Sequence, residues 1–319
     1  MSDALPDTSP ESRTRRTIPD QATKTVTAAA GGSWRLGDLT VHRIGFGAMR
    51  LTGRAAFTPG AASDRGRSIA VLRRAIELGV NHIDTASFYF SERRSANELI
   101  NSALAPYPED LVVVTKVWPG RDPSGEWFWA RPEQLRGQVE ENLRQLGRDH
   151  LDVVNLRVPS SVRDGSIAEH FGALAELREA GLVRHLGVSH VRPAQLAEAR
   201  TIAPVVCVQN PYGVGASAEQ EEVLRACGAA GIAFVPYFAI AGTGRERGAV
   251  AAEHEAVHEV ARAHGATPAQ IRLAWTLRRG PHVLAIPGTG DPAHLEENVA
   301  AGAVRLSDAE ASRLDAIAR

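Results

Sequence analysis

The chain has 319 residues, of which 44% are hydrophobic and 23% are charged, so it can bury a full core and is not disordered throughout. Its 36 basic and 37 acidic residues nearly cancel, which excludes a net field that would attract nucleic acid or an anionic membrane. We therefore expect small-molecule chemistry, carried out by a monomer or a weak homo-oligomer.

Two further features concern the location of the protein. Cys207 and Cys227 are too few for a disulfide framework and lack metal-ligand spacing, which fits a reducing compartment and predicts no metal site. No stretch reaches the roughly 18 consecutive apolar residues of a membrane span. We expect a cytoplasmic protein with no membrane partner.

The opening segment, residues 1–33, is rich in Ser, Thr, Asp, Pro and Ala and shows no apolar periodicity. Such a composition is typical of a disordered tail. From Trp34 onward no linker rich in Pro, Gly or Ser interrupts the pattern, so residues 34–319 are predicted to form one domain.

Short apolar runs alternate with amphipathic helical stretches along this domain. Eight strands are predicted, at Arg43–Met49, Val80–Asp84, Leu111–Lys116, Asp152–Leu156, His185–Ser189, Val205–Gln209, Ile232–Tyr237 and Val283–Ile286. A spacing close to 3.6 predicts helices at Ser68–Leu78, Ala96–Ala105, Pro132–Leu146, Ile167–Glu179, Pro193–Ile202, Glu219–Ala230 and Glu253–His264.

The order of these elements indicates the fold. Helices between successive strands imply parallel pairing, and runs such as Leu111–Val114 are apolar throughout, as in strands covered on both faces. Eight such units in series predict a single α/β TIM barrel of the (β/α)8 type, preceded by a short N-terminal hairpin. Pro268–Arg278 and Asp308–Ile317 are expected to be extra C-terminal helices.

Three polar residues fall at neighbouring strand ends, where barrel enzymes place their active sites. Asp84 ends the second predicted strand, Tyr89 lies in the following loop, and Lys116 ends the third strand. A tyrosine can protonate a carbonyl oxygen as negative charge develops there, if a neighbouring ammonium lowers its pKa from about 10. We expect Lys116 to do this and Asp84 to orient Lys116.

Each of these residues also has a structural interpretation. A strand-end Asp caps the next turn, a Lys extends to solvent, and a Tyr packs in a core. Their shared placement at one barrel mouth favours catalysis.

Several motifs resemble the aldo-keto reductase family. They are RIGFGAMRL from Arg43, NHIDTASFYF from Asn81, VVTKVW from Val113, GVSH from Gly187, VQNPY from Val208 and IPGTGDPAHLEEN from Ile286. The resemblance extends from residue 34 to about residue 317 and implies a barrel that transfers a hydride between a nicotinamide cofactor and a carbonyl compound.

The resemblance assigns Asp84, Tyr89 and Lys116 to the family's catalytic tetrad of Asp, Tyr, Lys and His. The chain departs at the fourth position, because LDVVNLRVP places Arg157 where the family has histidine. An arginine can still donate hydrogen bonds to a carbonyl oxygen, although it does not titrate at working pH. The alternative is a buried arginine that pairs with a carboxylate such as Asp84.

The resemblance also implies a cofactor site, with NADPH as the family expectation and NADH not excluded. It would hold the nicotinamide near Ser189, His190 and Gln209, with His190 standing where the family usually has asparagine. It would use the turn at Gly288 for phosphate. His294 stands where an arginine often binds the 2′-phosphate, and Asp291 lies close by and would repel that phosphate. The full set of implied contacts is Gly47, Met49, Ser189, His190, Gln209, Tyr237, Gly242, Gly288, Thr289, His294, Glu297 and Asn298.

Aromatic residues after the third strand are candidates for the substrate pocket: Phe90, Trp118, Trp127 and Trp129. A hydrophobic cluster that seats the next helix is the alternative.

Within the family, the VVNLR run, the HIDTxxFY form and the IPGT…AHLxEN ending are most similar to bacterial pyridoxal reductases, also called pyridoxine 4-dehydrogenases. Reduction of pyridoxal to pyridoxine is therefore the expected activity. Two alternatives stay open: a ketoreductase of a sugar or natural-product pathway, and a nicotinamide-bound regulatory protein like the potassium channel β subunits.

Overall fold

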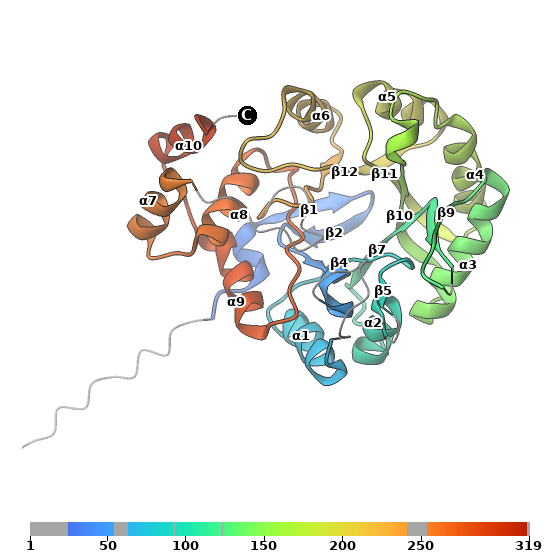
Figure 1. Ribbon diagram of the computed structural model, residues 1–319, viewed down its shortest axis with the longest axis horizontal. Coiled ribbons are helices and arrows are strands. Elements are labelled where there is room, and N and C mark those ends of the chain that lie inside the picture. The colour runs from blue at the N-terminus through green and yellow to red at the C-terminus, as the bar shows by residue number, and fades with distance from the viewer. Residues whose placement is uncertain (1–24, 54–62, 92–93, 123, 241–253, 318–319) are drawn as a thin grey trace, which may run out of the picture.

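A closed ring of parallel strands forms the centre of the molecule, and helices surround it (Figure 1). The computed structural model describes residues 25–53, 63–91, 94–122, 124–240 and 254–317. Seven strands follow the order β13-β12-β11-β10-β7-β4-β3. They are β3 (Phe46–Gly47), β4 (His82–Asp84), β7 (Val112–Val117), β10 (Leu151–Arg157), β11 (Val183–Ser189), β12 (Val205–Gln209) and β13 (Ala233–Phe234).

Residues 283–285 supply the eighth position and close the ring. Val283 forms a parallel bridge with Phe234, and Ala285 forms one with Ile44. The backbone N–H of Leu284 donates to the carbonyl of Phe234 at 2.9 Å, and that of Gly45 donates to the carbonyl of Ala285 at 2.8 Å. The predicted (β/α)8 barrel is confirmed.

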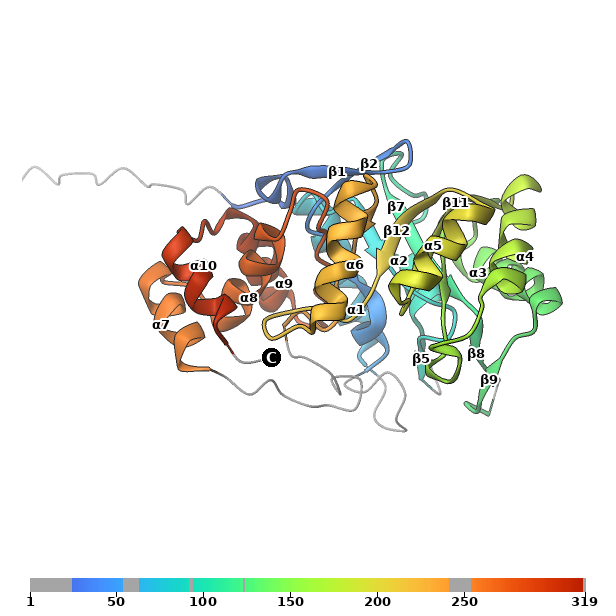
Figure 2. The same ribbon diagram turned by 90° about the horizontal axis from the view of Figure 1, so that it is seen from above.

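The helices lie outside the strands (Figures 1 and 2). They are α1 (Arg65–Glu77), α2 (Ala96–Leu104), α3 (Leu135–Leu146), α4 (Ala168–Glu179), α5 (Pro193–Ile202), α6 (Ala218–Ala229), α7 (Glu255–His264), α8 (Pro268–Arg278), α9 (Pro292–Ala300) and α10 (Asp308–Asp315). Short 3₁₀ turns occur at Ala28–Gly31, Ala48–Thr52, Pro132–Gln134, Ser160–Val162 and Ala301–Ala303.

Polar side chains cap the first turns of several helices. The side chain of Asp64 accepts from the backbone N–H of Arg67 at the start of α1, and that of Ser95 accepts from the backbone N–H of Glu98 at the start of α2.

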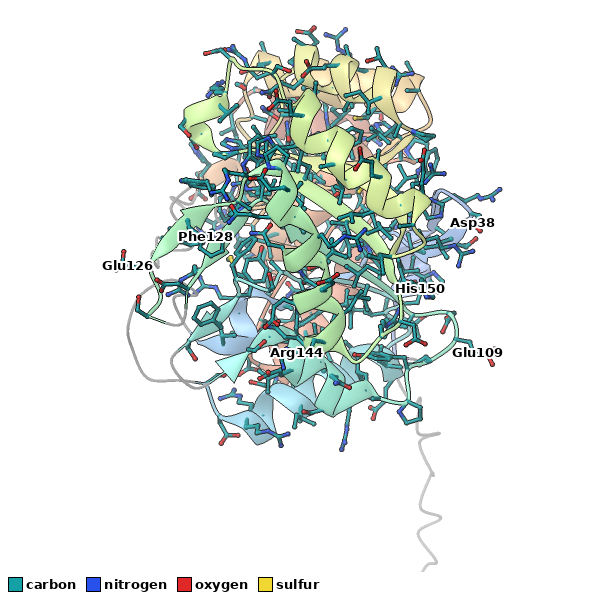
Figure 3. The ribbon with its side chains drawn as sticks, turned by 90° about the vertical axis from the view of Figure 1, so that its right-hand side faces the viewer. Asp38, Glu109, Glu126, Phe128, Arg144 and His150 are labelled. Atoms are coloured by element: carbon teal, nitrogen blue, oxygen red, sulfur yellow. The ribbon has the colours of Figure 1, made fainter. Side chains whose placement is uncertain are left out.

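Three antiparallel strand pairs lie outside the ring: β1 (Ser33–Leu36) with β2 (Leu39–His42), β5 (Phe90–Ser91) with β6 (Arg94–Ser95), and β8 (Pro119–Arg121) with β9 (Trp127–Trp129). The β1–β2 hairpin and the β8–β9 hairpin stand at opposite ends of the barrel (Figure 2). Figure 3 shows the same separation, with Asp38 of the first hairpin on one side and Phe128 of the second on the other.

Apolar side chains fill the barrel below its open end. Leu36 and Val41 of the β1–β2 hairpin pack with Val114, Val153 and other interior residues, all buried. The hairpin thereby plugs the end at which the strands begin, so solvent reaches the interior from the carboxyl ends of the strands. Across the described residues, no helix combines the length and apolar character that a bilayer span requires.

Two boundaries that the sequence predicted, the end of the N-terminal tail and the end of the first strand, differ from those in the structure. Of the predicted 1–33 tail, residues 1–24 lie outside the described part, but Ala28–Gly31 forms a 3₁₀ turn in which Ala28 is fully buried and its N–H donates to Leu78. This turn packs against the 3₁₀ turn Ala301–Ala303, so order begins before residue 34. The first strand also ends at Gly47, because Ala48–Thr52 turns into a 3₁₀ helix.

Candidate active site

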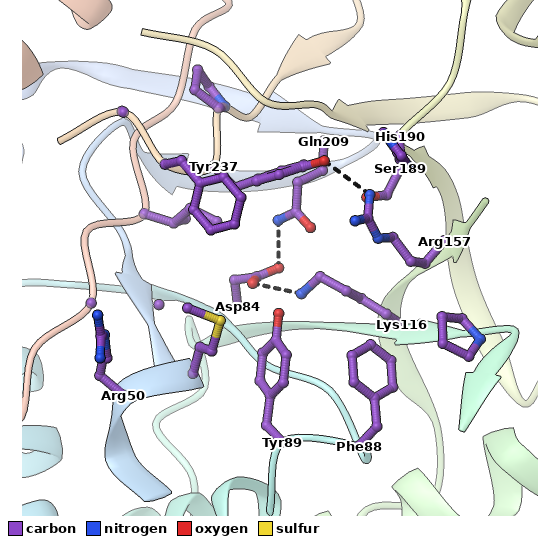
Figure 4. Close-up of a pocket in the computed structure, with 18 of the residues that line it drawn as sticks. Arg50, Asp84, Phe88, Tyr89, Lys116, Arg157, Ser189, His190, Gln209 and Tyr237 are labelled. Atoms are coloured by element: carbon purple, nitrogen blue, oxygen red, sulfur yellow. Dashed lines mark hydrogen bonds and ion pairs between the residues drawn. The ribbon is translucent and has the colours of Figure 1, made fainter. Parts of the chain in front are cut away.

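One residue from each of the eight strand positions around the barrel contributes to a mainly polar layer at the carboxyl ends of the strands. The layer consists of Gly47, Asp84, Lys116, Arg157, Ser189, Gln209, Tyr237 and Ile286, and all eight line one cavity of about 310 Å³ (Figure 4). The strand register explains the grouping, since Asp84 lies beside Gly47, and Ser189 lies between Arg157 and Gln209. The predicted strand-end residues are thus brought together.

A buried ion pair occupies the centre of this layer. The Nζ of Lys116 donates to Oδ1 of Asp84 at 2.6 Å and to the carbonyl of Thr85 at 2.9 Å. The other carboxylate oxygen of Asp84 accepts from Nε2 of Gln209 at 2.7 Å, and the two charged side chains are 4% and 5% exposed (Figure 4). Burial alone would lower the pKa of Lys116, but Asp84 and Tyr89 outweigh burial and raise it, so the ammonium form persists.

Behind the ion pair lies a buried hydrogen-bond network that the sequence analysis missed. The hydroxyl of Thr85 donates to Oδ1 of Asn97 in α2 at 2.8 Å, and Nδ2 of Asn97 donates to Oδ1 of Asn142 in α3 at 2.9 Å. Thr115, the neighbour of Lys116, donates to the same oxygen of Asn142 at 2.6 Å. Asparagines at core positions of helices were the available signal. The network ties the backbone around Lys116 to two helices.

Tyr89 is buried beside this pair. The Nζ of Lys116 lies 5.0 Å from the centroid of the Tyr89 ring, and Phe88 packs edge-on against that ring at 5.2 Å. Burial raises the pKa of Tyr89; Lys116 and Arg157 lower it, and Asp84 raises it. Lys116 therefore acts in the predicted direction, but burial outweighs it, so the expected net lowering of the Tyr89 pKa is wrong for the protein alone.

Arg157 enters the cavity from the end of β10. Its Nη1 donates to the hydroxyl of Tyr237 at 3.0 Å and to Oγ of Ser189 at 3.5 Å, and its guanidinium carbon lies 5.1 Å from the Tyr237 ring centroid. Among the described residues no carboxylate forms an ion pair with Arg157, since both oxygens of Asp84 are engaged by Lys116 and Gln209. The carboxylate-pairing alternative does not describe this arginine.

His190 adopts a left-handed backbone conformation, with φ of 62°. Asn and His both tolerate this region better than most residues, which accounts for histidine at a position where the family has asparagine. Its Nδ1 lies 3.2 Å from the carbonyl of Val158, and burial together with the charge of Arg157 lowers its pKa. The ring is therefore neutral near pH 7 and carries its proton on Nδ1.

The cavity suits a nicotinamide. The oxygen of the Gln209 amide accepts no hydrogen bond from the described protein, and Ser189 offers a buried hydroxyl beside it (Figure 4). These groups match the donors and acceptors of a carboxamide. Gly47 and Gly288 let two backbone segments of the cavity wall lie close together, since a Cβ at Gly47 would lie 2.6 Å from the carbonyl oxygen of Ile286 and one at Gly288 would meet the carbonyl of Gly47.

The predicted phosphate turn is partly occupied. Asp291 caps α9, and its carboxylate accepts from the N–H groups of Ala293 at 2.8 Å and His294 at 3.4 Å, so these two donors do not present themselves to a phosphate. Asp291 also pairs with Arg67 of α1. The hydroxyl of Thr289 accepts from the N–H of Asp291.

Most of the remaining predicted cofactor residues lie apart from the cavity or beyond the described part. His294 is exposed, Glu297 is half-buried and Asn298 is buried, all on α9. None of the three lines the cavity, whereas Met49 does. Gly242 lies outside the described residues.

The four predicted pocket aromatics separate into two groups. Trp127 and Trp129 of β9 line the cavity, with ring centroids 6.5 Å apart. Trp118 is buried and stacks on His170 at 3.8 Å, and Phe90 lies against the guanidinium of Arg121 at 4.4 Å. Neither Trp118 nor Phe90 lines the cavity, so both serve the packing around the hairpin.

The barrel and its polar mouth define an oxidoreductase that acts on small carbonyl compounds, and the comparisons agree. A model of the aldo/keto reductase family matches residues 43–319. The chain belongs to the aldo/keto reductase family, as the sequence motifs predicted.

Several relatives support this assignment. Pyridoxine 4-dehydrogenase of Escherichia coli is 43% identical over 91% of this chain and 99% of its own length. A methylglyoxal reductase of the same organism is 31% identical over 80% of this chain and 85% of its own. A solved aldo-keto reductase of Klebsiella pneumoniae in complex with NADPH is 28% identical, covers 86% of this chain and 90% of its own, and superimposes with a TM-score of 0.71.

Proposed function

We propose that the protein reduces pyridoxal to pyridoxine with NADPH. The observation that carries this proposal is the buried Asp84–Lys116 pair with Tyr89 against it, at the mouth of a barrel cavity. The similarity to an E. coli pyridoxine 4-dehydrogenase supports the choice of substrate.

NADPH, when bound, supplies the hydride that reduces the carbonyl carbon, and it leaves as NADP⁺. Tyr89 donates its hydroxyl proton to the carbonyl oxygen, so the aldehyde becomes an alcohol. The ammonium of Lys116 stabilises the resulting phenolate, which regains a proton from water, and Asp84 keeps that ammonium in place. The raised pKa of Tyr89 keeps its proton available at neutral pH.

Ser189 and Gln209 would hold the carboxamide, and Tyr237 would cover the nicotinamide ring. We choose NADPH over NADH because a solved family member binds NADPH. Asp291 opposes this choice only weakly, since Arg67 pairs with its charge.

A purified-enzyme assay tests the proposal. Oxidation of NADPH or NADH is followed by its absorbance with pyridoxal, methylglyoxal, sugars and ketones, and pyridoxine is identified as a product. Tyr89→Phe serves as the inactive control. Reduction of ketones or sugars without pyridoxal would favour a biosynthetic ketoreductase, and tight NADPH binding without turnover of any carbonyl would favour a regulatory protein.

A further inference from the structure

Several N–H groups of the Arg157 guanidinium have no acceptor among the described residues that surround the cavity. Its Nη1 serves Tyr237 and Ser189, whereas Nε and Nη2 donate to no group among the residues that the structure describes. Arg157 is only half-buried, and Figure 4 shows its side chain reaching into the cavity from the side opposite Arg50. Three N–H bonds of a permanent cation are therefore available to a ligand.

The neighbouring walls favour a flat ligand. Phe88 and Trp127 lie 5.7 Å apart between ring centroids, and both line the cavity with Trp129. The carboxylate in the layer, Asp84, is already neutralised by Lys116. An aromatic ring that carries a negative charge would thus meet both aromatic walls and an uncompensated cation.

We propose that Arg157 is a specificity-determining residue that binds an ionised oxygen adjacent to the reacting carbonyl, so that the preferred substrates are aromatic aldehydes with an ortho oxyanion. This inference rests on the proposed function, because pyridoxal carries such an oxygen next to its aldehyde. It explains why a permanent cation stands where the family has a titrating histidine.

The planar fork of arginine can reach two oxygens at once. During hydride addition the aldehyde oxygen gains negative charge beside an oxygen that is already negative, and the two repel each other. A guanidinium that binds both oxygens relieves this repulsion most strongly in the transition state. Arg157 should therefore raise kcat as well as lower KM for such substrates.

The test compares 2-hydroxybenzaldehyde with 2-methoxybenzaldehyde and benzaldehyde, each with NADPH. The unsubstituted protein should show a kcat/KM for the hydroxy compound about 10- to 100-fold above that for the methoxy compound, as expected from one charge-assisted hydrogen bond. Arg157→Met should abolish this preference, whereas any change in the Kd for NADPH that follows from the lost contacts to Ser189 and Tyr237 affects all three aldehydes equally. Arg157→Lys, which keeps the charge without the fork, should retain part of it.

Arg163→Met is the matched control, because Arg163 is an exposed arginine outside the cavity that pairs with Glu219. It should keep the full preference. Should the Arg157 variants fail to fold, the unsubstituted protein still decides: its kcat/KM for the hydroxy compound, relative to the methoxy compound, must rise as pH passes the pKa of the substrate's phenol.

Three results would overturn the inference. They are an equal loss on all three aldehydes in Arg157→Met, a weakened NADPH complex with the preference intact, and a hydroxy-to-methoxy ratio that does not change with pH. The proposed function fails separately, if pyridoxal itself is not reduced while the preference among the benzaldehydes is present.

Discussion

Removal of the Lys116 ammonium should destabilise the fold strongly, because it leaves the Asp84 carboxylate buried. The Asp84 side chain is 5% exposed and would keep only Gln209 as a hydrogen-bond donor. Breaking a buried pair from one side costs about 3–5 kcal/mol. For a domain of this size, Lys116→Met should lower Tm by about 5–8 °C.

The matched variant removes both charges. Asp84→Asn combined with Lys116→Met leaves no buried ion, so most of the lost stability should return, while reductase activity stays absent in both variants. Urea unfolding at pH 7, with equal m-values as the check on two-state behaviour, provides the measurement. This prediction is contradicted if the single variant loses less than about 1 kcal/mol, or if the double variant is no more stable than the single one. Either result would mean that Lys116 does not compensate a costly buried charge on Asp84.

Four further predictions concern the rest of the site. Tyr89→Phe should lower carbonyl reduction by about 10² to 10⁴ with the NADPH Kd retained. In the unsubstituted protein the rate should stay level through neutral pH and fall only as pH rises through the raised Tyr89 pKa, a decline that stopped-flow rates would reveal. Trp127→Ala should raise KM with little change in Tm, since this side chain is 42% exposed, whereas Trp118→Ala at the buried stack should lower Tm instead. Asp291→Ser keeps a helix cap and frees Arg67, so titration should show tighter NADPH binding relative to NADH; tighter NADH alone would contradict it.

The sequence was sufficient for the barrel because short apolar runs marked the strands and a spacing close to 3.6 marked most of the helices between them. It was also sufficient to group the polar layer, since residues at the carboxyl ends of parallel strands share one mouth. It could not show that Trp118, whose φ is 96°, lies outside the cavity and stacks on His170 instead. Nor could it show the Asn97–Asn142 hydrogen bond, which depends on how α2 and α3 pack.

Two departures from the family pattern turn out to be neighbours, and this proximity supports a common cause. The imidazole of His190 contacts the carbonyl of Val158, the residue that follows Arg157, and the charge of Arg157 contributes to the lowered pKa of His190. A protonated imidazole there would repel the guanidinium, so a permanent cation at position 157 requires a neutral partner at position 190. Burial keeps the histidine neutral there, and the left-handed backbone accommodates histidine as well as asparagine. We therefore infer that Arg157 is a cation positioned for a ligand and that His190 is kept uncharged beside it. On this view Arg157 is not the remnant of a lost catalytic histidine.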